Sequence, residues 1–269
     1  MPAPALTFVT TCKGRLHHLQ QTLPLLAAAA EARCIVVDYG CPDRAGDWVE
    51  AHFPQVHVVR QPDATDFNPS RARNLGVEAA ISDVICLIDA DVRIAPAFVP
   101  AILRQFDVRH YYVPEPLTGD LTGTFVCARA AFQFAEGYDE AFSGWGGEDL
   151  DLYERFELHG LQRSGFPAAL LSPLTHTDAQ RTRHHSIADK NFSNSMNLIY
   201  SHIKLDLMRL SRNRLPLEFR RTLYAQVRDA CAASAAQRQP IALELPYAEA
   251  ALNFVRLETT LVYRIDMSP

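Results

Sequence analysis

The sequence predicts an α/β protein with an open, mostly parallel central sheet flanked by helices, followed by a C-terminal helical extension. Three observations support this fold class. Short apolar runs, such as residues 34–38 and 84–88, alternate with segments of helical periodicity through the first part of the chain. Continuous apolar runs of this kind are typical of strands that a parallel sheet buries on both faces. From about residue 193 onward, two long amphipathic patterns replace the alternation.

The spacing of apolar residues places the expected elements along the chain. In the first half we expect strands at residues 6–10, 34–38, 56–59 and 84–88. We also expect helices at residues 16–30 and 46–52, and a third helix that follows the loop at residue 67 and ends at about residue 80. A helix at 96–106, strands at 111–113 and 123–127, a helix at 147–159 and a strand at 168–171 follow. In the extension, Ile199, Ile203, Leu207 and Leu210 share one helical face, and Phe219, Leu223 and Val227 share another.

Composition narrows the class of protein. A chain of 269 residues with 48% hydrophobic content can bury a sizeable core without disulfides. Its formal net charge of −5 argues against a nucleic-acid partner, which requires a basic surface. The six cysteines are scattered without a CxxC pair, which indicates reduced, buried thiols. With neither a signal peptide nor a long apolar span in the sequence, we expect a cytoplasmic protein, with peripheral contact at the inner membrane face as a variant of that expectation.

Acidic residues follow two of the predicted strands. Asp38 ends the run 34–38, and Asp89-Ala90-Asp91 follows the run 84–88. Ligands of open α/β sheets bind outside the carboxyl ends of the strands, so we expect these acids and the loop at residues 10–15 to meet at one rim. Two carboxylates at a strand end offer hard oxygen ligands to Mg²⁺ or Mn²⁺. The alternative is that they cap a helix or form a turn.

A glycine-rich acidic stretch, residues 143–151 (SGWGGEDLD), lies near the middle of the chain. Its carboxylates stand at the head of a predicted helix, where the helix dipole favours negative charge, so a capped helix is one interpretation. The other is a site of chemistry, because acids this close repel one another unless a cation or a proton relieves them. Trp145 between glycines is typical of a loop that moves to cover a ligand.

Three further sets of residues have two interpretations each. Arg71 and Arg73 can neutralise a diphosphate, or they can pair with the surplus acids. Asp38 can accept a hydrogen bond from a ribose hydroxyl or a uracil N–H, or it can simply form a turn. His176 can be a third metal ligand, and the sequence does not rank it against three other histidines. Those alternatives are His159, His184 and His185.

In these motifs the chain resembles the GT-A glycosyltransferases of the large inverting family 2. Its GWGGED stretch is similar to that of the β-1,4-galactosyltransferases and of bacterial chondroitin-type polymerases. The matching pieces follow the family's order over roughly residues 5–180. They are Thr10–Arg15, Val37-Asp38, Phe67-Asn68, Arg71, Asn74-Leu75-Gly76, Asp89-Ala90-Asp91, Gly137–Glu140, Gly144–Asp149 and His176. The sequence departs from the animal galactosyltransferases at Leu150, where they carry a third consecutive acid, and it lacks a methionine just before His176.

The resemblance implies a catalytic domain over residues 1–192, with a nucleotide-binding half at 1–110 and an acceptor half at 111–192, and leaves 193–269 as a helical extension. It implies that Asp149 is the general base, with Glu148 holding sugar hydroxyls. Asp91, Asp89 and His176 would bind Mn²⁺ or Mg²⁺. The donor would be contacted by Thr10, Arg15, Asp38, Phe67, Arg71, Asp89, Trp145, Gly146 and Gly147.

The implied function is metal-dependent, inverting transfer of a hexose or N-acetylhexosamine from a UDP-sugar to a saccharide or glycolipid hydroxyl, in the synthesis of a cell-surface polysaccharide. Two alternatives are a non-catalytic nucleotide-sugar-binding protein and a sugar-nucleotidyltransferase. The second would carry a glycine-rich basic loop after the first strand, to which residues 10–15 are a poor approximation. The resemblance does not cover the C-terminal helices, which we expect to be amphipathic with solvated outer faces; peripheral membrane contact or homodimer formation is the alternative.

Overall fold

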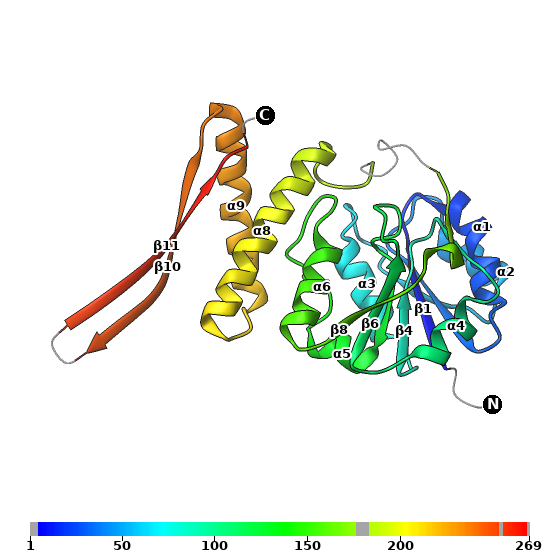
Figure 1. The fold of residues 1–269 in the computed structure, drawn as a ribbon. Helices are drawn as coiled ribbons and strands as arrows, with labels where there is room; N and C mark the ends of the chain where they lie inside the picture. Colours follow the sequence, from blue (N-terminus) through cyan, green and yellow to red (C-terminus); the bar gives the residue numbers. More distant parts are fainter. Residues whose placement is uncertain (1–4, 176–182, 253–254, 268–269) are drawn as a thin grey trace. The chain divides into compact units, whose positions relative to one another are not determined.

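A computed structural model describes residues 5–175, 183–252 and 255–267, and the chain divides into two compact units (Figure 1). The first unit spans residues 1–190 and the second residues 191–269. His176, a predicted metal ligand, lies outside the described residues.

The first unit is built on a seven-stranded sheet with the strand order β3-β2-β1-β4-β7-β6-β8. β1 pairs in parallel with β2 and β4, while β7 runs antiparallel to both of its neighbours, β4 and β6. Every strand of this sheet except β7 therefore runs in one direction. The strands are β1 (Leu6–Cys12), β2 (Ala32–Asp38), β3 (His57–Arg60), β4 (Val84–Leu87), β6 (His110–Glu115), β7 (Phe125–Ala128) and β8 (Gln162–Pro167).

Helices cover both faces of this sheet (Figure 1). Neighbouring residues of β1 face opposite sides, so Phe8 belongs to one hydrophobic cluster and Val9 to the other. Phe8 packs with residues of α1, α2 and α4, whereas Val9 packs with residues of α3 and α6. The helices are α1 (Leu16–Ala27), α2 (Ala45–His52), α3 (Pro69–Glu78), α4 (Phe98–Gln105), α5 (Arg129–Phe134) and α6 (Glu148–Leu158).

Local chemistry explains why α3 begins and sits where it does. The Asn68 side chain accepts a hydrogen bond from the Arg71 backbone N–H, and Pro69 occupies the first turn, where its missing N–H costs nothing. Gly76 lets the helix approach the sheet closely, because a Cβ there would collide with Val9 and Val37. This contact sets the distance from the sheet at which α3 presents its other buried side chains.

The predicted strand at residues 168–171 is wrong. Residues Ala168–Leu170 form a 3₁₀ helix, and strands lie on either side of it, β8 before and β9 (Leu171–Pro173) after. β8 was missed because QRSGFP is a mostly polar edge strand that shows no apolar alternation. β5 (Val92–Ile94), which pairs with β9 outside the main sheet, and the short α5 were also not predicted.

The second unit contains two long helices, α8 (Lys190–Ser211) and α9 (Leu217–Gln237). The middle of each predicted apolar face is buried, whereas Leu210 and Phe219 at the ends of these faces are exposed. The unit also contains a hairpin that was not predicted, β10 (Ile241–Leu252) with β11 (Val255–Ile265). Alternation at residues 259–265 was the available strand signal. Within the described part of the chain, none of the helices combines the length and the apolar character needed to cross a membrane.

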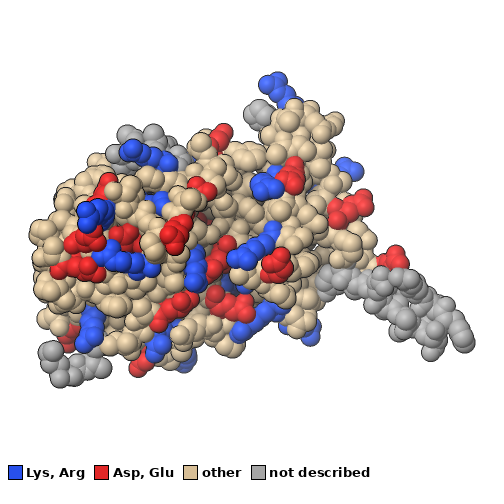
Figure 2. Space-filling view, turned by 180° about the vertical axis from the view of Figure 1, so that it is seen from behind, with Lys and Arg blue, Asp and Glu red and all other residues tan. Residues whose placement is uncertain are grey.

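Charged side chains are interspersed over the face that Figure 2 shows, without a large patch of one sign. The six cysteines are all buried and unpaired, as predicted.

Candidate active site

The acids predicted to meet at one rim do lie on one edge of the sheet. Asp38 ends β2, and Asp89 and Asp91 follow β4, which runs parallel to β2 through β1. The start of α6 joins this edge, because one side chain of α3, Arg73, contacts both Asp89 and Glu148. The two acidic stretches of the sequence therefore belong to one site.

Arg73 is the centre of the site. Its Nη2 lies 2.9 Å from Asp89 Oδ1, and its Nη1 lies 3.0 Å from Glu148 Oε1 and 3.2 Å from Asp149 Oδ1. The guanidinium also stacks over the Tyr138 ring at 4.9 Å from the centroid. A planar fork of donors can serve several carboxylates at once, which a lysine ammonium does less well. Arg73 relieves the acid cluster without neutralising it, since three carboxylates share one cation.

Asp149 is held in an unusual environment. The Tyr138 hydroxyl donates to its Oδ1 at 2.7 Å, beside the contact from Arg73. Burial raises the pKa of the Asp149 carboxyl to about 7, although Arg73 and the Tyr138 hydrogen bond act in the opposite direction. Its side chain still keeps 14% of its surface exposed, so a small molecule can reach it. A carboxyl of this kind can accept a proton near neutral pH.

Glycines shape the loop that leads into α6. Gly144, Gly146 and Gly147 have φ of 78°, 90° and 88°, a region that other residues rarely adopt. The helix begins at Glu148 with three acids in its first turn, which the helix dipole favours. Asp151, the third of these acids, is fully buried and paired with Arg155, so it has the structural role that the capped-helix interpretation gave it.

Asn74 and Glu140 position Tyr138. The Asn74 side chain donates to the Tyr138 carbonyl at 3.0 Å and accepts from its N–H at 2.9 Å. The same Asn74 amide donates to Glu140, whose carboxylate lies 3.1 Å from Arg71 Nη1. Arg71, expected to line the donor pocket, thus pairs with acids, which was its alternative interpretation.

On the other side of the rim, Asp38 is fully engaged in a turn. Its Oδ1 accepts from the Cys41 backbone N–H at 2.8 Å, and its Oδ2 accepts from that of Gly46 at 2.7 Å. This is the turn-forming role that the sequence left open. Thr10 is buried in β1, and its hydroxyl makes no hydrogen bond to any residue that the structure describes.

Lys13 and Arg15 tie the loop after β1 to its surroundings. Lys13 is buried, and its Nζ donates to the carbonyls of Ala64 at 2.6 Å and Tyr39 at 3.1 Å. Arg15 Nη1 lies 2.8 Å from Asp91 Oδ2. Cations therefore contact both Asp89 and Asp91, the first from α3 and the second from this loop.

The segment at residues 183–190 lies against the rim. Phe67, which packs edge-on against Tyr39 at 5.8 Å, donates its N–H to the His184 carbonyl at 2.8 Å. The His185 ring contacts Phe67 at 5.5 Å, and burial lowers the pKa of both histidines. By contrast, His159 lies at the far end of α6 from Glu148. Of the alternative histidines, His184 and His185 are therefore near the donor side and His159 is not.

Trp145, at the centre of the glycine loop, packs against the same segment. Lys190 Nζ lies 4.6 Å from the centre of the Trp145 ring, and the hydroxyls of Ser143 and Ser186 are 2.6 Å apart. The loop is therefore in contact with the segment at residues 183–190. It has polar and cation–π contacts rather than a fully buried ring.

The residues available for a metal fit a hard cation by their chemistry. Asp89 and Asp91 provide carboxylate oxygens, which suit Mn²⁺ and Mg²⁺. Within residues 5–175, 183–252 and 255–267, no three His, Cys, Asp or Glu side chains converge as a metal centre. The predicted third ligand, His176, is outside these ranges.

Of the two interpretations that the sequence left open for Arg73, the structure shows pairing with the surplus acids. Tyr138 had no predicted role in the site. The available signal was the buried face of α3, which carries the polar residues Ser70, Arg73 and Asn74 where apolar ones are expected. A buried arginine requires acidic partners, so its presence on that face indicated carboxylates packed above the helix.

Two family matches cover most of the first unit. Residues 7–120 match the family described as "Glycosyl transferase family 2", and residues 104–185 match "N-terminal domain of galactosyltransferase". β-1,4-galactosyltransferase 2 of Homo sapiens is 30% identical over 120 residues, which are 40% of this chain and 32% of that protein. β-1,4-galactosyltransferase 1 of Bos taurus is 27% identical over 119 residues, which are 40% and 30% of the two chains. The alignments thus span about a third of the length of these relatives.

Solved structures share the fold. S. aureus TarS superposes with a TM-score of 0.58 at 12% identity, over 82% of this chain and 42% of that one. The mannosyltransferase PcManGT from Pyrobaculum calidifontis, solved in complex with GDP-Man and Mn²⁺, gives a TM-score of 0.54 at 12% identity, over 87% and 74% of the chains. The predicted fold class is confirmed: the chain has the GT-A fold of glycosyltransferases, with a mostly parallel central sheet.

Proposed function

We propose that this chain, which carries a glycosyltransferase domain of GT-A fold, transfers a hexose or N-acetylhexosamine from a UDP-sugar to a hydroxyl of a saccharide or glycolipid acceptor, with inversion at the anomeric carbon. The observation that carries the proposal is Asp149: a largely buried carboxyl, reachable from solvent, with a pKa near 7. In an inverting displacement the acceptor hydroxyl must lose a proton as it attacks, and a base with such a pKa suits that step.

The two oxygens of Asp149 differ in their contacts, which supports giving them different roles. Oδ1 is engaged by the Tyr138 hydroxyl and by Arg73, which hold the carboxylate in place. Oδ2 has no hydrogen bond to any residue that the structure describes, and it is the oxygen we assign to the acceptor hydroxyl. Glu148, fixed by Arg73, would accept hydroxyls of the sugars beside it.

The donor side would be formed by Asp89, Asp91 and the loop that carries Arg15. Asp89 and Asp91, with His176, would hold Mn²⁺ or Mg²⁺. Such an ion, when bound, supplies positive charge to the diphosphate oxygens. Arg15, now paired with Asp91, is the cation of this chain best placed to stabilise the leaving diphosphate. Phe67 would flank the nucleotide.

Trp145 would close the site. The glycines at 144, 146 and 147 have positive φ and give the loop conformational freedom. The Trp145 ring makes a cation–π contact with Lys190 and is not packed in the core. Movement of this ring over a bound donor would exclude water, which limits hydrolysis of the sugar nucleotide.

The test is a screen of UDP-sugars and acceptors for UDP release in the presence of Mn²⁺, comparing wild type with Asp149→Asn. Loss of the base should lower kcat by about 10²–10⁴-fold. Glu154→Gln is the matched control, because Glu154 is an exposed carboxylate on the same helix. Transfer by Asp149→Asn at the wild-type rate would refute the base assignment.

Calorimetry separates this function from its alternatives. Binding of UDP with Mn²⁺ but no turnover over the whole panel would favour a non-catalytic nucleotide-sugar-binding protein. Release of pyrophosphate from UTP and a sugar phosphate would favour a nucleotidyltransferase. Absence of UDP binding would remove the donor-site assignment altogether.

A further inference from the structure

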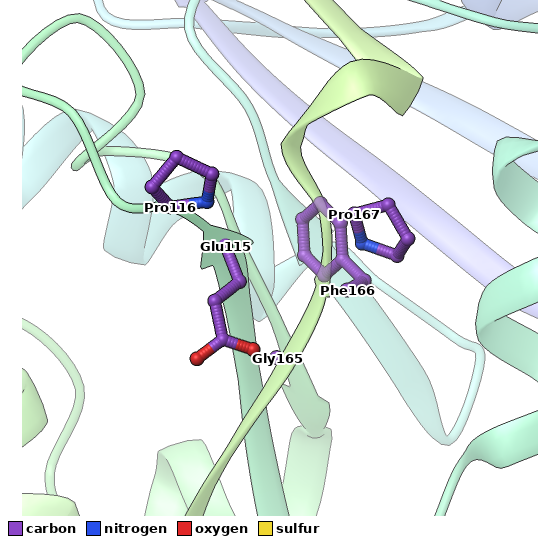
Figure 3. Close-up of a pocket in the computed structure, with 5 residues that line it drawn as sticks. All are labelled: Glu115, Pro116, Gly165, Phe166 and Pro167. Carbon is purple, nitrogen blue, oxygen red and sulfur yellow. The ribbon is translucent and has the colours of Figure 1, made fainter.

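A pocket of about 480 Å³ opens where β6 and β8 end. Glu115 and Pro116 line it from the end of β6, and Gly165, Phe166 and Pro167 line it from the end of β8 (Figure 3). β6 and β8 are parallel, so these ends lie on the edge of the sheet where Asp89 follows β4. The volume is within the range of about 300–1,000 Å³ that is usual for small-molecule sites.

Glu115 is the polar group of this pocket. Its carboxylate lies beside Gly165 (Figure 3), and it has no hydrogen bond or ion pair with any residue in the described part of the chain. A Cβ at residue 165 would collide with the Glu115 carboxylate, so the glycine keeps space for that side chain. The apolar surface of the pocket comes from the exposed Pro116 and Pro167, because the Phe166 ring is buried in the core against Phe98.

Register places Glu115 level with the start of α6. The Tyr111 hydroxyl of β6 donates to Glu157 near the end of α6 at 2.7 Å. Four strand residues separate Tyr111 from Glu115, a rise of about 13 Å. Nine helical residues separate Glu157 from Glu148, also a rise of about 13 Å. Tyr111 and Glu115 share a face of the sheet, because side chains alternate along a strand, and that face is the one α6 covers.

Across the sheet, one strand, β7, lies between β4 and β6. At the usual strand spacing the end of β6 is about 10 Å from the end of β4, where Asp89 lies. The pocket is on the side of β4 opposite to β1 and β2, which carry the loops assigned to the nucleotide. The pocket therefore lies beside the site, on the side away from the donor. One or two sugar units can span the distance between the pocket and the site.

We propose that this pocket binds the second sugar unit of an oligosaccharide acceptor, next to the unit that reacts at Asp149; this inference rests on the function proposed above. Pyranose rings have apolar C–H faces that pack on exposed prolines such as Pro116 and Pro167, and hydroxyls that donate to a carboxylate such as Glu115. The lining includes no cation, so it disfavours a phosphate or a uronic acid and selects a neutral sugar.

The test compares Gly165→Ala with wild type on p-nitrophenyl hexosides and on the corresponding p-nitrophenyl disaccharides. The added methyl displaces Glu115 and should raise KM for the disaccharide about tenfold, with KM for the monosaccharide and kcat unchanged. Glu115→Gln, which keeps the shape, should raise the same KM about threefold, in line with a weaker hydrogen bond to a neutral acceptor. Gly119→Ala is the matched control, since a Cβ there meets no atom within 4 Å.

Three results would overturn the inference: unchanged KM for disaccharides in both pocket variants, equal loss with mono- and disaccharides, or no preference of wild type for disaccharides. If wild type transfers no sugar at all, the proposed function fails, and the pocket is then judged by binding alone. Saturation-transfer NMR with p-nitrophenyl cellobioside, lactoside, maltoside and chitobioside should show contact in wild type and a weaker signal in Gly165→Ala. Equal signals in the two proteins reject the subsite.

Discussion

Two carboxylates on the same rim, Asp38 and Asp149, have opposite surroundings. Each oxygen of Asp38 accepts a hydrogen bond from a backbone N–H, so this carboxylate stabilises the turn that begins α2. Asp149 is contacted by Tyr138 and Arg73 on one oxygen, shares Arg73 with two other acids, and has a pKa of about 7. The number and kind of hydrogen-bond donors therefore decide whether an acid at this edge of the sheet has a structural role or remains available for chemistry.

The largest expected effect comes from removing the cation that the acid cluster shares. Arg73→Gln leaves Asp89, Glu148 and Asp149 without their common partner, and loss of one member of a buried ion pair costs about 3–5 kcal/mol. Urea unfolding at pH 8 would measure it, with the exposed Arg109→Gln as control. A smaller deficit at pH 5, where Asp149 takes up a proton, is also expected. An unchanged free energy of unfolding would show that Arg73 is not the organising charge.

Asp38→Asn should destabilise the donor side. The neutral amide is a weaker acceptor for the backbone N–H groups of Cys41 and Gly46, and one of its two positions becomes an NH₂ that faces a donor. We expect a loss of about 2 kcal/mol in the free energy of unfolding at pH 8, since hydrogen bonds to charged groups contribute about that much. Stability equal to wild type would mean that the turn does not depend on this carboxylate.

Asp149→Asn should stabilise the folded protein at pH 8, whereas Asp38→Asn should destabilise it. The folded pKa of Asp149, about 7, is above its unfolded value, so the stability it contributes is present below about pH 4 and is lost as the pH rises to about 7. At pH 8 the variant, which lacks the buried charge, should unfold with a free energy roughly 1–2 kcal/mol higher than wild type, and the difference should vanish near pH 4. Thermal melts across this range would decide it. A destabilised variant at pH 8 would place Asp149 with Asp38 as a structural acid.

The smallest expected effect is a shift of the pH profile. For wild type, kcat/KM for the acceptor should rise with pH through about 7 as Asp149 loses its proton. Tyr138 donates to the ionised carboxylate and so lowers the Asp149 pKa; Tyr138→Phe should therefore move the profile to higher pH. Phe132→Leu, a buried neighbour of the Tyr138 ring without a polar group, is the control for packing. A shift to lower pH would contradict the assignment of Asp149 as base.

Most helices and buried strands could be predicted from the sequence, because their periodicity is local. β2 and β4 are continuous apolar runs, and the Asn68-Pro69 start of α3 is a local capping signal. β8 could not be predicted in the same way, because a polar edge strand is stabilised by pairing with β6 rather than by its own pattern. The β10–β11 hairpin was not predicted, although residues 259–265 show the alternation typical of a strand.

For the site, the sequence identified the acids, but it gave their pairing with Arg73 only as one of two interpretations. Asp89, Asp91, Glu148 and Asp149 stand out because carboxylates after buried strands and glycine turns are conspicuous. Their assignment between structural and reactive roles depended on contacts that no spacing reveals. The assignment of donor contacts to Thr10, Arg71 and Asp38 remains a prediction. In this structure Arg71 and Asp38 have partners within the fold, and Thr10 is buried in β1.

By itself, the sequence determined the alternating α/β architecture and the two acidic stretches, since hydrophobic periodicity and turn chemistry act over a few residues. Only the tertiary structure decided that Arg73 joins Glu148, 75 residues away, and that Asn74 holds the Tyr138 backbone, 64 residues away. The physical reason is burial: a carboxyl acquires a pKa near 7 only when distant segments remove its water and limit its donors.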